Sequence, residues 1–376
     1  MTRKKVLQVA YGSLANGGIQ AVIMSIVRNL AEDIDFDILV FSSKKEYYDD
    51  EFLKYGRIFR IPIREKENRF LNECEHYYRW IKILSGCYHI LKNGNYDAIH
   101  CHNEIESGIC TLAAHLLGVK IRISHAHNTA SPQRDSYVKM IYKFINKKLI
   151  EMNSNVKIGC SKKANEYMFG KKDKKAVVIN NAIDLTRFDR AKYMLICKDR
   201  SMLHFVHVGR YCFQKNQIFL LEVFNLIREE LKNSRLTLVG FGEDEDMIKS
   251  KIQELRLEGY IKMLPHDTDI PRLFANADYM IFPSRFEGLG IVLLEAQAMG
   301  VKCFASSVVP PEADMGLCTY LPLYDGAQAW AENIIDYIKD HKDESREIRQ
   351  EVKEQYDIRK IAQKYKAIYC NDMNVK

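Results

Sequence analysis

The stretch from Ile281 to Gly300 carries the residues with the clearest chemistry, because it joins a buried strand to a helix through a glycine turn. Gly288 and Gly290 let the backbone approach a ligand closely, and the free N–H groups at the start of the helix favour anionic oxygens. Glu287 in the turn and Glu295 inside the helix add carboxylates, which suit sugar hydroxyls. The stretch therefore predicts a site for a ligand with anionic and hydroxyl groups.

Two cations after an earlier apolar run offer further anion ligands. Arg210 follows Gly209 at the end of this run, and Lys215 lies five residues further on. A guanidinium with fixed donors and a mobile ammonium together fit a diphosphate, and each charge-assisted hydrogen bond contributes about 1.5 to 3 kcal/mol. Without the glycine turn, two solvated surface cations would be the simpler interpretation.

Two further pairs of glycines follow predicted strands. Gly17 and Gly18 precede the first helix, where the loop either approaches a phosphate or an acceptor or only forms a tight turn. Gly240 and Gly242 resemble half of a dinucleotide-binding fingerprint. The third glycine is missing, so we do not expect a redox cofactor.

Two His-x-His pairs end two other strands, His100 with His102 and His125 with His127. Alternation along a strand places each pair on one face, and with Cys101 nearby a zinc site is conceivable. A cysteine between two histidines on a strand faces away from them, however, so we expect no metal. Buried histidines that are satisfied by hydrogen bonds are an alternative interpretation.

Apolar runs that alternate with helical patterns must position these residues. Continuous Val, Ile and Leu strands joined by amphipathic helices predict the α/β class, with parallel sheets covered on both faces. We expect strands at 6–10, 37–41, 58–62, 97–102, 121–127, 156–160 and 176–180, and again at 203–209, 236–240, 261–264, 278–282 and 302–305. The irregular segment 186–200 separates the two sets, which predicts doubly wound domains at 1–190 and 200–356 with a ligand between them.

Composition supports a globular protein of two domains. The chain has 376 residues, of which 47% are hydrophobic and 28% charged. Its ten cysteines are scattered without a CxxC pair, which favours free thiols in a reducing compartment. No apolar stretch is long enough for a signal peptide or a membrane span, and the formal charge of +7 favours anionic partners.

The stretch from Ile281 to Gly300 resembles the signature of retaining glycosyltransferases of family 4, which have the GT-B fold of two Rossmann-like domains facing a central cleft. Seven residues separate Glu287 from Glu295, as in the family, and Arg210 with Lys215 matches the family's pair of pyrophosphate ligands. The resemblance covers essentially the whole chain. It implies that the last helix, in 357–376, packs back on the first domain.

The resemblance implies a role for each matching residue. Implied donor-binding residues are Gly17, Gly18, Gly209, Arg210, Lys215, Glu287, Gly288, Leu289, Gly290 and Glu295. Implied catalytic residues are His127, Glu287, Arg210 and Lys215, with His127 near the anomeric carbon of the sugar. On the acceptor side the resemblance suggests His100, His102 and Asn103.

The implied reaction is transfer of a hexose or N-acetylhexosamine, with retention, from a nucleoside diphosphate sugar that is most often linked to UDP. The subgroup typified by the sequence Glu295–Gln297 assembles capsular polysaccharides and exopolysaccharides, so we expect a glycan or lipid-linked acceptor and no cofactor or metal. The alternatives are a GT-B sugar-nucleotide epimerase or hydrolase, and a basic nucleic-acid-binding protein. The last predicts aromatic residues interleaved with cations on one exposed sheet, which the sequence lacks.

A basic amphipathic stretch at 137–149 carries four lysines, Lys139, Lys143, Lys147 and Lys148, among apolar residues at helical spacing. It is either a core helix with a solvated face or a peripheral contact with an anionic membrane. With a lipid-linked acceptor, the second interpretation predicts a cytoplasmic enzyme at the inner face of the cell membrane.

Overall fold

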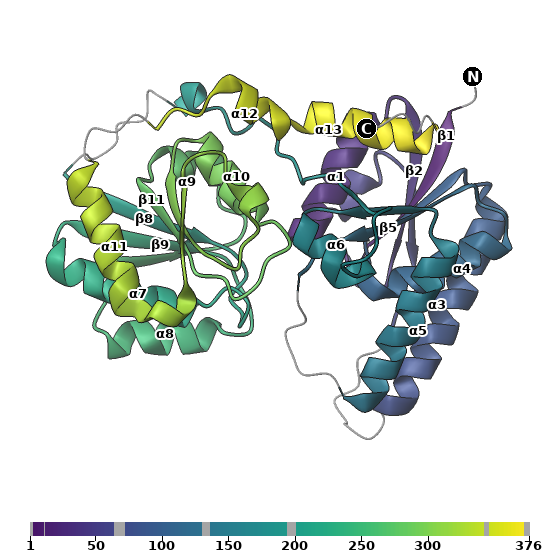
Figure 1. Cartoon of the computed structure of the whole chain (residues 1–376), viewed down its shortest axis with the longest axis horizontal. Helices are drawn as coiled ribbons and strands as arrows, with labels where there is room; N and C mark the ends of the chain where they lie inside the picture. The colour runs from purple at the N-terminus through teal and green to yellow at the C-terminus, as the bar shows by residue number, and fades with distance from the viewer. Residues whose placement is uncertain are drawn as a thin grey trace. The chain divides into compact units, whose positions relative to one another are not determined.

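In the computed structural model the chain forms two units, each built around one parallel sheet (Figure 1). The structure describes residues 3–10, 12–63, 72–129, 136–193, 201–341 and 346–371. The first unit contains Met1–Asn181 together with Ile358–Lys376, and the second is Ala182–Asp357. The predicted domain boundaries lay at 190, 200 and 356, and part of the predicted linker, 194–200, falls outside the described residues.

The first sheet has seven strands in the order β3-β2-β1-β4-β5-β6-β7, all parallel. The strands are β1 (Lys4–Val9), β2 (Ile34–Val40), β3 (Ile58–Arg60), β4 (Ala98–Cys101), β5 (Ile121–Ala126), β6 (Val156–Gly159) and β7 (Val177–Val178). The helices are α1 (Gly18–Leu30), α2 (Asp49–Phe52), α3 (Asn72–Gly94), α4 (Ser107–Leu116), α5 (Tyr137–Asn153), α6 (Lys162–Phe169) and α13 (Ile358–Tyr369), with the 3-10 turn η1 (Glu104–Glu106).

Alternation along the central strands gives this sheet two different faces. Leu7, Val9, Ile99 and Cys101 pack with α3 and α4 in one apolar core. The residues between them, Gln8 and His100 among them, face the opposite way, toward α13. Figure 1 shows α13 next to α1 on that side. The last helix of the chain therefore completes the first unit; residues 372–376 of the predicted terminal segment lie outside the described part.

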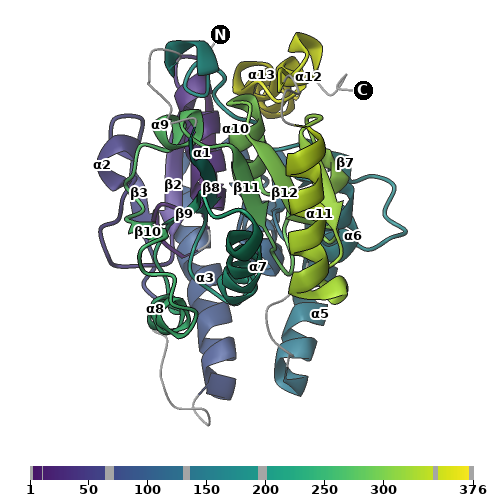
Figure 2. The same ribbon diagram turned by 90° about the vertical axis from the view of Figure 1, so that its left-hand side faces the viewer.

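The second sheet has six parallel strands in the order β10-β9-β8-β11-β12-β13, and Figure 2 shows the first five side by side. The strands are β8 (Leu203–Val208), β9 (Ser234–Val239), β10 (Ile261–Leu264), β11 (Tyr279–Phe282), β12 (Lys302–Ser306) and β13 (Cys318–Leu321). The helices of this unit are α7 (Gln217–Glu230), α8 (Glu245–Glu254), α9 (Ile270–Ala275), α10 (Ile291–Ala298), α11 (Gly326–Asp340) and α12 (Gln350–Gln355). Its core packs α7, α8 and α11 against one face, around the fully buried Trp330.

Both sheets reverse their strand order next to the first strand, between β1 and β4 and between β8 and β11. In doubly wound sheets this switch point, at the carboxyl ends of the strands, is where ligands bind. The α/β class and the two Rossmann-like sheets confirm the predicted fold. Within the described ranges, no helix has both the length and the apolar content that a bilayer span needs.

Candidate active site

At the switch point of the second sheet, the loops after β8 and β11 are fastened to each other. The backbone N–H of Arg285 donates to the carbonyl of Gln214 at 2.8 Å, and the Gln214 amide donates to the carbonyl of Phe286 at 2.9 Å. The Asn216 amide donates to the carbonyl of Pro283 at 3.2 Å. These bonds bring the two predicted motifs, which are far apart in sequence, to one place.

Lys215 and Glu287 form a buried ion pair at this place. The Lys215 Nζ lies 2.6 Å from the Glu287 Oε1, and the two side chains are 16% and 7% exposed. The ammonium also lies 4.7 Å from the centre of the Phe282 ring, which favours a cation. Gly209 leaves room for the lysine stem, because a Cβ there would lie 3.3 Å from its Cε. The predicted diphosphate ligand and the predicted sugar ligand are thus in direct contact.

Two helix N-termini open onto the same loops. Asn216 precedes α7 with a φ of 58°, and Gly290 precedes α10 with a φ of 86°, so both take the left-handed conformation. Neither side chain caps its helix. The first N–H groups of both helices and the positive ends of their dipoles are therefore available to an anion beside Lys215.

Arg210 lies at the rim of this site. Its side chain is exposed and forms an ion pair with Glu243 at 2.9 Å. Two residues that the sequence analysis missed fix its backbone: the Gln217 amide donates to the Arg210 carbonyl at 2.8 Å, and it also contacts the His207 ring at 3.3 Å. Burial lowers the pKa of His207 to about 4, so this ring is a neutral support.

The glycines of the Gly240-Phe241-Gly242 segment have a packing role. A Cβ at Gly240 would lie 2.1 Å from the Gly209 carbonyl oxygen, and one at Gly242 would lie 2.1 Å from that of Tyr211. Both glycines have a φ near +157°, which permits this approach. They let the loop after β9 support the loop that carries Arg210.

Glu295 lies inside α10 as predicted, eight residues after Glu287. Burial raises the pKa of its carboxyl to about 7, and the charge of Arg187 acts in the opposite direction. A carboxyl in this state gains from hydrogen-bond donors such as hydroxyls. Gly288 and Leu289, between the two glutamates, are buried in the turn.

In the first unit, the N-terminus of α1 is the counterpart of these helix starts. Gly17 precedes the helix without a side-chain cap, and a Cβ at Gly18 would meet no atom within 4 Å. The space is therefore open at Gly18, whereas at Gly17 a Cβ would lie 2.6 Å from the Gln20 Oε1 and the N–H already donates to the Ala15 carbonyl. This geometry fits the predicted phosphate or acceptor contact and does not distinguish it from a simple turn.

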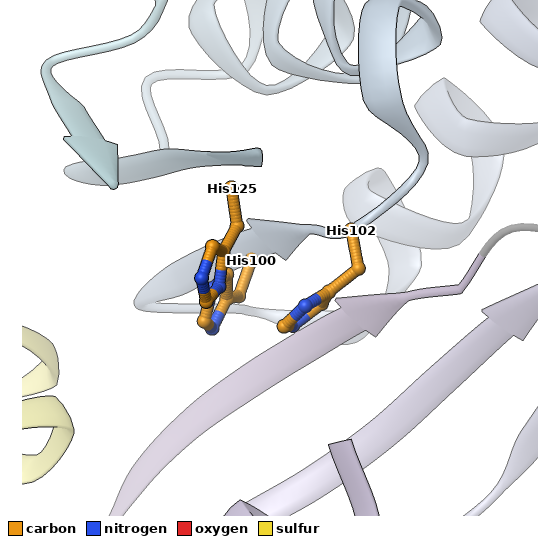
Figure 3. A group of neighbouring side chains, drawn as sticks. All are labelled: His100, His102 and His125. Carbon is orange, nitrogen blue, oxygen red and sulfur yellow. The ribbon is translucent and has the colours of Figure 1, made fainter. Parts of the chain in front are cut away.

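The four histidines of the first unit form one buried hydrogen-bonded network, part of which is drawn in Figure 3. His102 Nε2 lies 3.0 Å from the Gln8 Oε1, which only accepts, so this nitrogen carries a proton and Nδ1 accepts from His127 Nε2 at 2.8 Å. The Gln8 amide donates to the Tyr369 hydroxyl, which donates to His100 Nδ1 at 2.6 Å. His100 Nε2 then donates to His125 Nδ1 at 3.1 Å.

This network corrects the predicted acceptor side. His100, His102 and Asn103 have no exposed surface, because they lie between the sheet and α13 or against α4, so they do not contact a glycan directly. The alternative of satisfied buried histidines fits His100 and His102. His127 is 6% exposed at the end of the network, and burial lowers its pKa to about 3, so it is neutral.

A metal would have to break the network. Ring nitrogens of His100, His102 and His125 lie within 4.8 Å of one another, which makes them a possible metal-ligand group among the described residues. A neutral imidazole has one lone pair, and in all three rings that lone pair accepts a hydrogen bond. The ring planes of His100 and His125 are 8° apart, and Figure 3 shows the two rings close together.

The sequence analysis missed one carboxylate at the same edge of the first sheet. Glu104 follows β4, and the Asn128 amide donates to its Oε1 at 2.9 Å. Burial raises the pKa of the Glu104 carboxyl to about 7. Neither residue belongs to a motif that spacing alone would reveal.

A hollow in the second unit lies away from all of these groups. It has a volume of about 580 Å³ and is lined by residues that begin β8, β9 and β10 and by α9, including His204, Arg235 and Lys262. It is therefore at the opposite edge of the second sheet from Lys215 and Glu287.

Sequence comparison finds two matching family profiles. The one described as Glycosyltransferase Family 4 matches residues 16–187, and the one described as Glycosyl transferases group 1 matches residues 199–355. EpsF of Bacillus subtilis is 29% identical over 89% of this chain and 87% of the relative. The capsular polysaccharide biosynthesis glycosyltransferase CapH of Staphylococcus aureus is 28% identical over 78% of each chain. The UDP-Gal:alpha-D-GlcNAc-diphosphoundecaprenol alpha-1,3-galactosyltransferase of Escherichia coli is 26% identical over 77% of this chain and 76% of the relative.

Solved structures agree on the fold. HepE of Anabaena, in complex with UDP and glucose, superposes with a TM-score of 0.74 at 17% identity and covers 97% of this chain and 98% of its own. The lipopolysaccharide glycosyltransferase WaaG superposes with a TM-score of 0.69 at 14% identity and covers 98% of each chain.

Proposed function

Since the chain belongs to the family 4 glycosyltransferases with the GT-B fold, we propose that it transfers a hexose or N-acetylhexosamine from a UDP-linked sugar, with retention, to a growing lipid-linked polysaccharide. The observation that carries the donor assignment is the buried pair of Lys215 with Glu287, between the N-termini of α7 and α10. Membership of the family makes the protein a hexosyltransferase that acts in polysaccharide or lipid-linked glycan synthesis.

In this proposal the second unit stabilises the leaving diphosphate. The bond between the anomeric carbon and the diphosphate oxygen breaks, and its electron pair remains on the diphosphate. Lys215, the N–H groups of α7 and α10, and Arg210 at the rim supply positive charge where this negative charge develops. These groups would do so without a metal. The acceptor oxygen bonds to the anomeric carbon on the same face, and its proton passes to a diphosphate oxygen.

The two glutamates would hold hydroxyl groups of the donor. Glu287 lies beside the ammonium that would bind the diphosphate, which suits contact with the adjoining sugar. Glu295 is held further along α10, where its buried carboxyl suits the ribose hydroxyls. Hydrogen bonds to ionised acceptors are the strong kind, about 1.5 to 3 kcal/mol each. His127 stays the predicted catalytic residue of the first unit.

We further propose that α5 contacts an anionic membrane. Its apolar residues Tyr137, Met140, Ile141, Phe144 and Ile145 form one stripe at helical spacing, and all are exposed, with Tyr137 at 78% and Phe144 at 65%. The buried side of the helix contains Ile150 together with Asn146 and Asn153. The helix is thus apolar on its exposed side as well. A core helix would bury that stripe, so the second of the two predicted interpretations fits.

Lysines flank this stripe and would meet lipid phosphates. Lys139 and Lys148 lie on the same helix, and a cation near an anionic surface contributes about 1 kcal/mol. The Lys147 ammonium is bound to the carbonyl of Tyr167 at 2.6 Å, so it belongs to the fold rather than to the surface. Such a helix would place the enzyme at the inner face of the cell membrane, where a lipid-linked acceptor is met.

The test of the proposed function is a thermal-shift screen with UDP, GDP and ADP and with their sugars. A ligand bound only by the folded chain raises its melting temperature, so UDP and one UDP-sugar should raise it and GDP and ADP should not. Product analysis by NMR should then show an α-linked sugar on the acceptor. No shift with any nucleotide would overturn the donor assignment, and release of free sugar or an epimer in the presence of acceptor would favour a hydrolase or an epimerase.

A further inference from the structure

Glu104 has a backbone conformation that its side chain disfavours. Its φ is +54°, in the left-handed region where a Cβ crowds the following carbonyl. Glycine, asparagine and aspartate occupy this region far more readily than glutamate. Outliers of this kind concentrate at functional sites, where the surrounding structure holds them in place.

The carboxyl group of Glu104 is held between two adjacent strands. Glu104 follows β4, and the Asn128 amide, which donates to its Oε1, follows β5. Strands β4 and β5 pair directly, and their carboxyl ends form the ligand-binding edge of the sheet. His127, the predicted catalytic residue of this unit, directly precedes Asn128 in the chain.

Across the residues that the structure describes, no lysine or arginine forms an ion pair with the carboxylate of Glu104. By contrast, Glu106, two residues later, is bound by both Arg79 Nε and Nη2. Without such a partner, burial raises the pKa of Glu104 to about 7. Its carboxylate therefore gains from any further neutral donor that reaches it.

A purely structural role does not account for these features. The hydrogen bond to Asn128 ties two loops, but a glycine at position 104 would relieve the backbone conformation, and an asparagine would tolerate it and still offer an oxygen. Glutamate adds a negative charge and reach, at a partly exposed position of the ligand-binding edge. Both are what recognition of a hydroxyl group needs.

We propose that Glu104 binds a hydroxyl group of the sugar acceptor and selects for acceptors that carry it. This inference rests on the proposed transfer of a sugar to a glycan and names a specificity-determining residue in the first unit. The hydroxyl donates to the carboxylate, which already accepts from the Asn128 amide and has no ion-pair partner among the described residues. A site built on such a bond rejects an analogue that lacks the hydroxyl, because the added hydrogen bond to the carboxylate is then lost.

Saturation-transfer NMR tests this with methyl glycosides of glucose, galactose, N-acetylglucosamine and N-acetylgalactosamine. Each sample contains the protein, one glycoside and UDP. The variants are Glu104→Ala, Glu104→Gln and Glu104→Gly, and Glu32→Gln is the matched control because it removes an exposed carboxylate from the same unit. We expect one glycoside signal to fall at least five-fold in the alanine and glycine variants, to persist partly in the glutamine variant, and to stay unchanged in the control. Its deoxy analogues should identify the hydroxyl.

The UDP signal and the melting temperature distinguish a failure of this inference from a failure of the proposed donor site. The UDP signal should be the same in all variants; if UDP does not bind the wild type, the proposed donor site fails, and the glycoside result still decides the role of Glu104. The melting temperature of the glycine variant should not fall, because glycine suits the backbone at this position. Glycoside signals that persist in the alanine variant, or are absent from the wild type, would overturn the inference, and so would a large drop in the melting temperature of the glycine variant.

Discussion

Replacing Lys215 by methionine should separate the contribution of its ion pair with Glu287 to stability from the contribution of the lysine to UDP binding. The methionine keeps much of the stem but leaves the Glu287 carboxylate, 7% exposed, without its cation. Breaking a buried pair by removing one partner costs about 3 to 5 kcal/mol. Because the lysine is 16% exposed and so partly solvated, we expect a smaller loss, about 2 to 3 kcal/mol of unfolding free energy.

The reverse variant, Glu287→Gln, and the double variant complete a cycle. With both charges removed, no uncompensated group is left, so the double variant should recover at least about 1 kcal/mol relative to the sum of the single losses. Affinity for UDP should behave differently. Lys215→Met loses a charge-assisted bond of about 1.5 to 3 kcal/mol, which is roughly 10- to 150-fold in Kd, and the double variant should bind UDP as weakly.

Urea unfolding and calorimetric titration with UDP give the two measurements. Glu287→Gln alone is the matched control, because UDP lacks the transferred sugar that Glu287 is proposed to hold. Its UDP affinity should stay near that of the wild type, while its affinity for the preferred UDP-sugar falls. The reasoning is wrong if Lys215→Met binds UDP within two-fold of the wild type, or if the two stability losses simply add in the double variant.

Three further variants test other parts of the site. The pKa of Glu295 is raised to about 7 from an ordinary 4.5, so the free energy of unfolding falls by up to about 3 kcal/mol as the pH rises from 4.5 to 7. Urea unfolding at pH 5 and pH 8 should show this fall for the wild type and not for Glu295→Gln. His127→Ala should lose most of its turnover and keep its UDP affinity within a few-fold, whereas equal losses in both would contradict a catalytic role. Serine at both Ile141 and Phe144 should abolish flotation with anionic vesicles at low salt. The control variant Met152→Ser, at an exposed position further along the same helix, should float as the wild type does. Equal flotation of the control and the double serine variant would exclude α5 as the membrane contact.

Most of the fold follows from the central strands. Buried runs such as Tyr279–Phe282 are apolar on both faces, so their type and position could be predicted to within a few residues. Of the four edge strands, β3 and β10 were predicted to within two residues, whereas β7 and β13 lack this pattern. Cys318–Leu321, on the edge of the second sheet, has only its last residue fully buried and was missed, and Val177–Val178 is two exposed residues where five were expected. One-sided burial leaves too weak a sequence signal at these edges.

The sequence marks single residues of the candidate site but does not show which of them are in contact. Glycine turns and cations at strand ends mark Lys215 and Glu287 separately, but the two residues are 72 positions apart, and only the parallel register of β8 and β11 brings them together. Glu104 shows nothing unusual in sequence, because its backbone conformation and its hydrogen bond to Asn128 exist only after β4 and β5 pair. On α5, helical spacing predicted the apolar stripe but not which side of the helix would face the core.

The last helix makes the first unit depend on the order of synthesis. Tyr369 is translated 269 residues after His100, yet its hydroxyl donates to His100 and accepts from Gln8 inside the first sheet. While the nascent chain lacks this helix, the His100 ring and the Gln8 amide lose the Tyr369 hydroxyl, and the face of the sheet that α13 covers is open to water. The second unit is continuous from Ala182 to Asp357, so it can fold before the last helix is synthesised, although most of the first unit precedes it in the chain. A premature stop that removes only the last helix would therefore leave the second unit, which directly precedes that helix in the chain, intact. It would destabilise the first unit, to which the helix belongs.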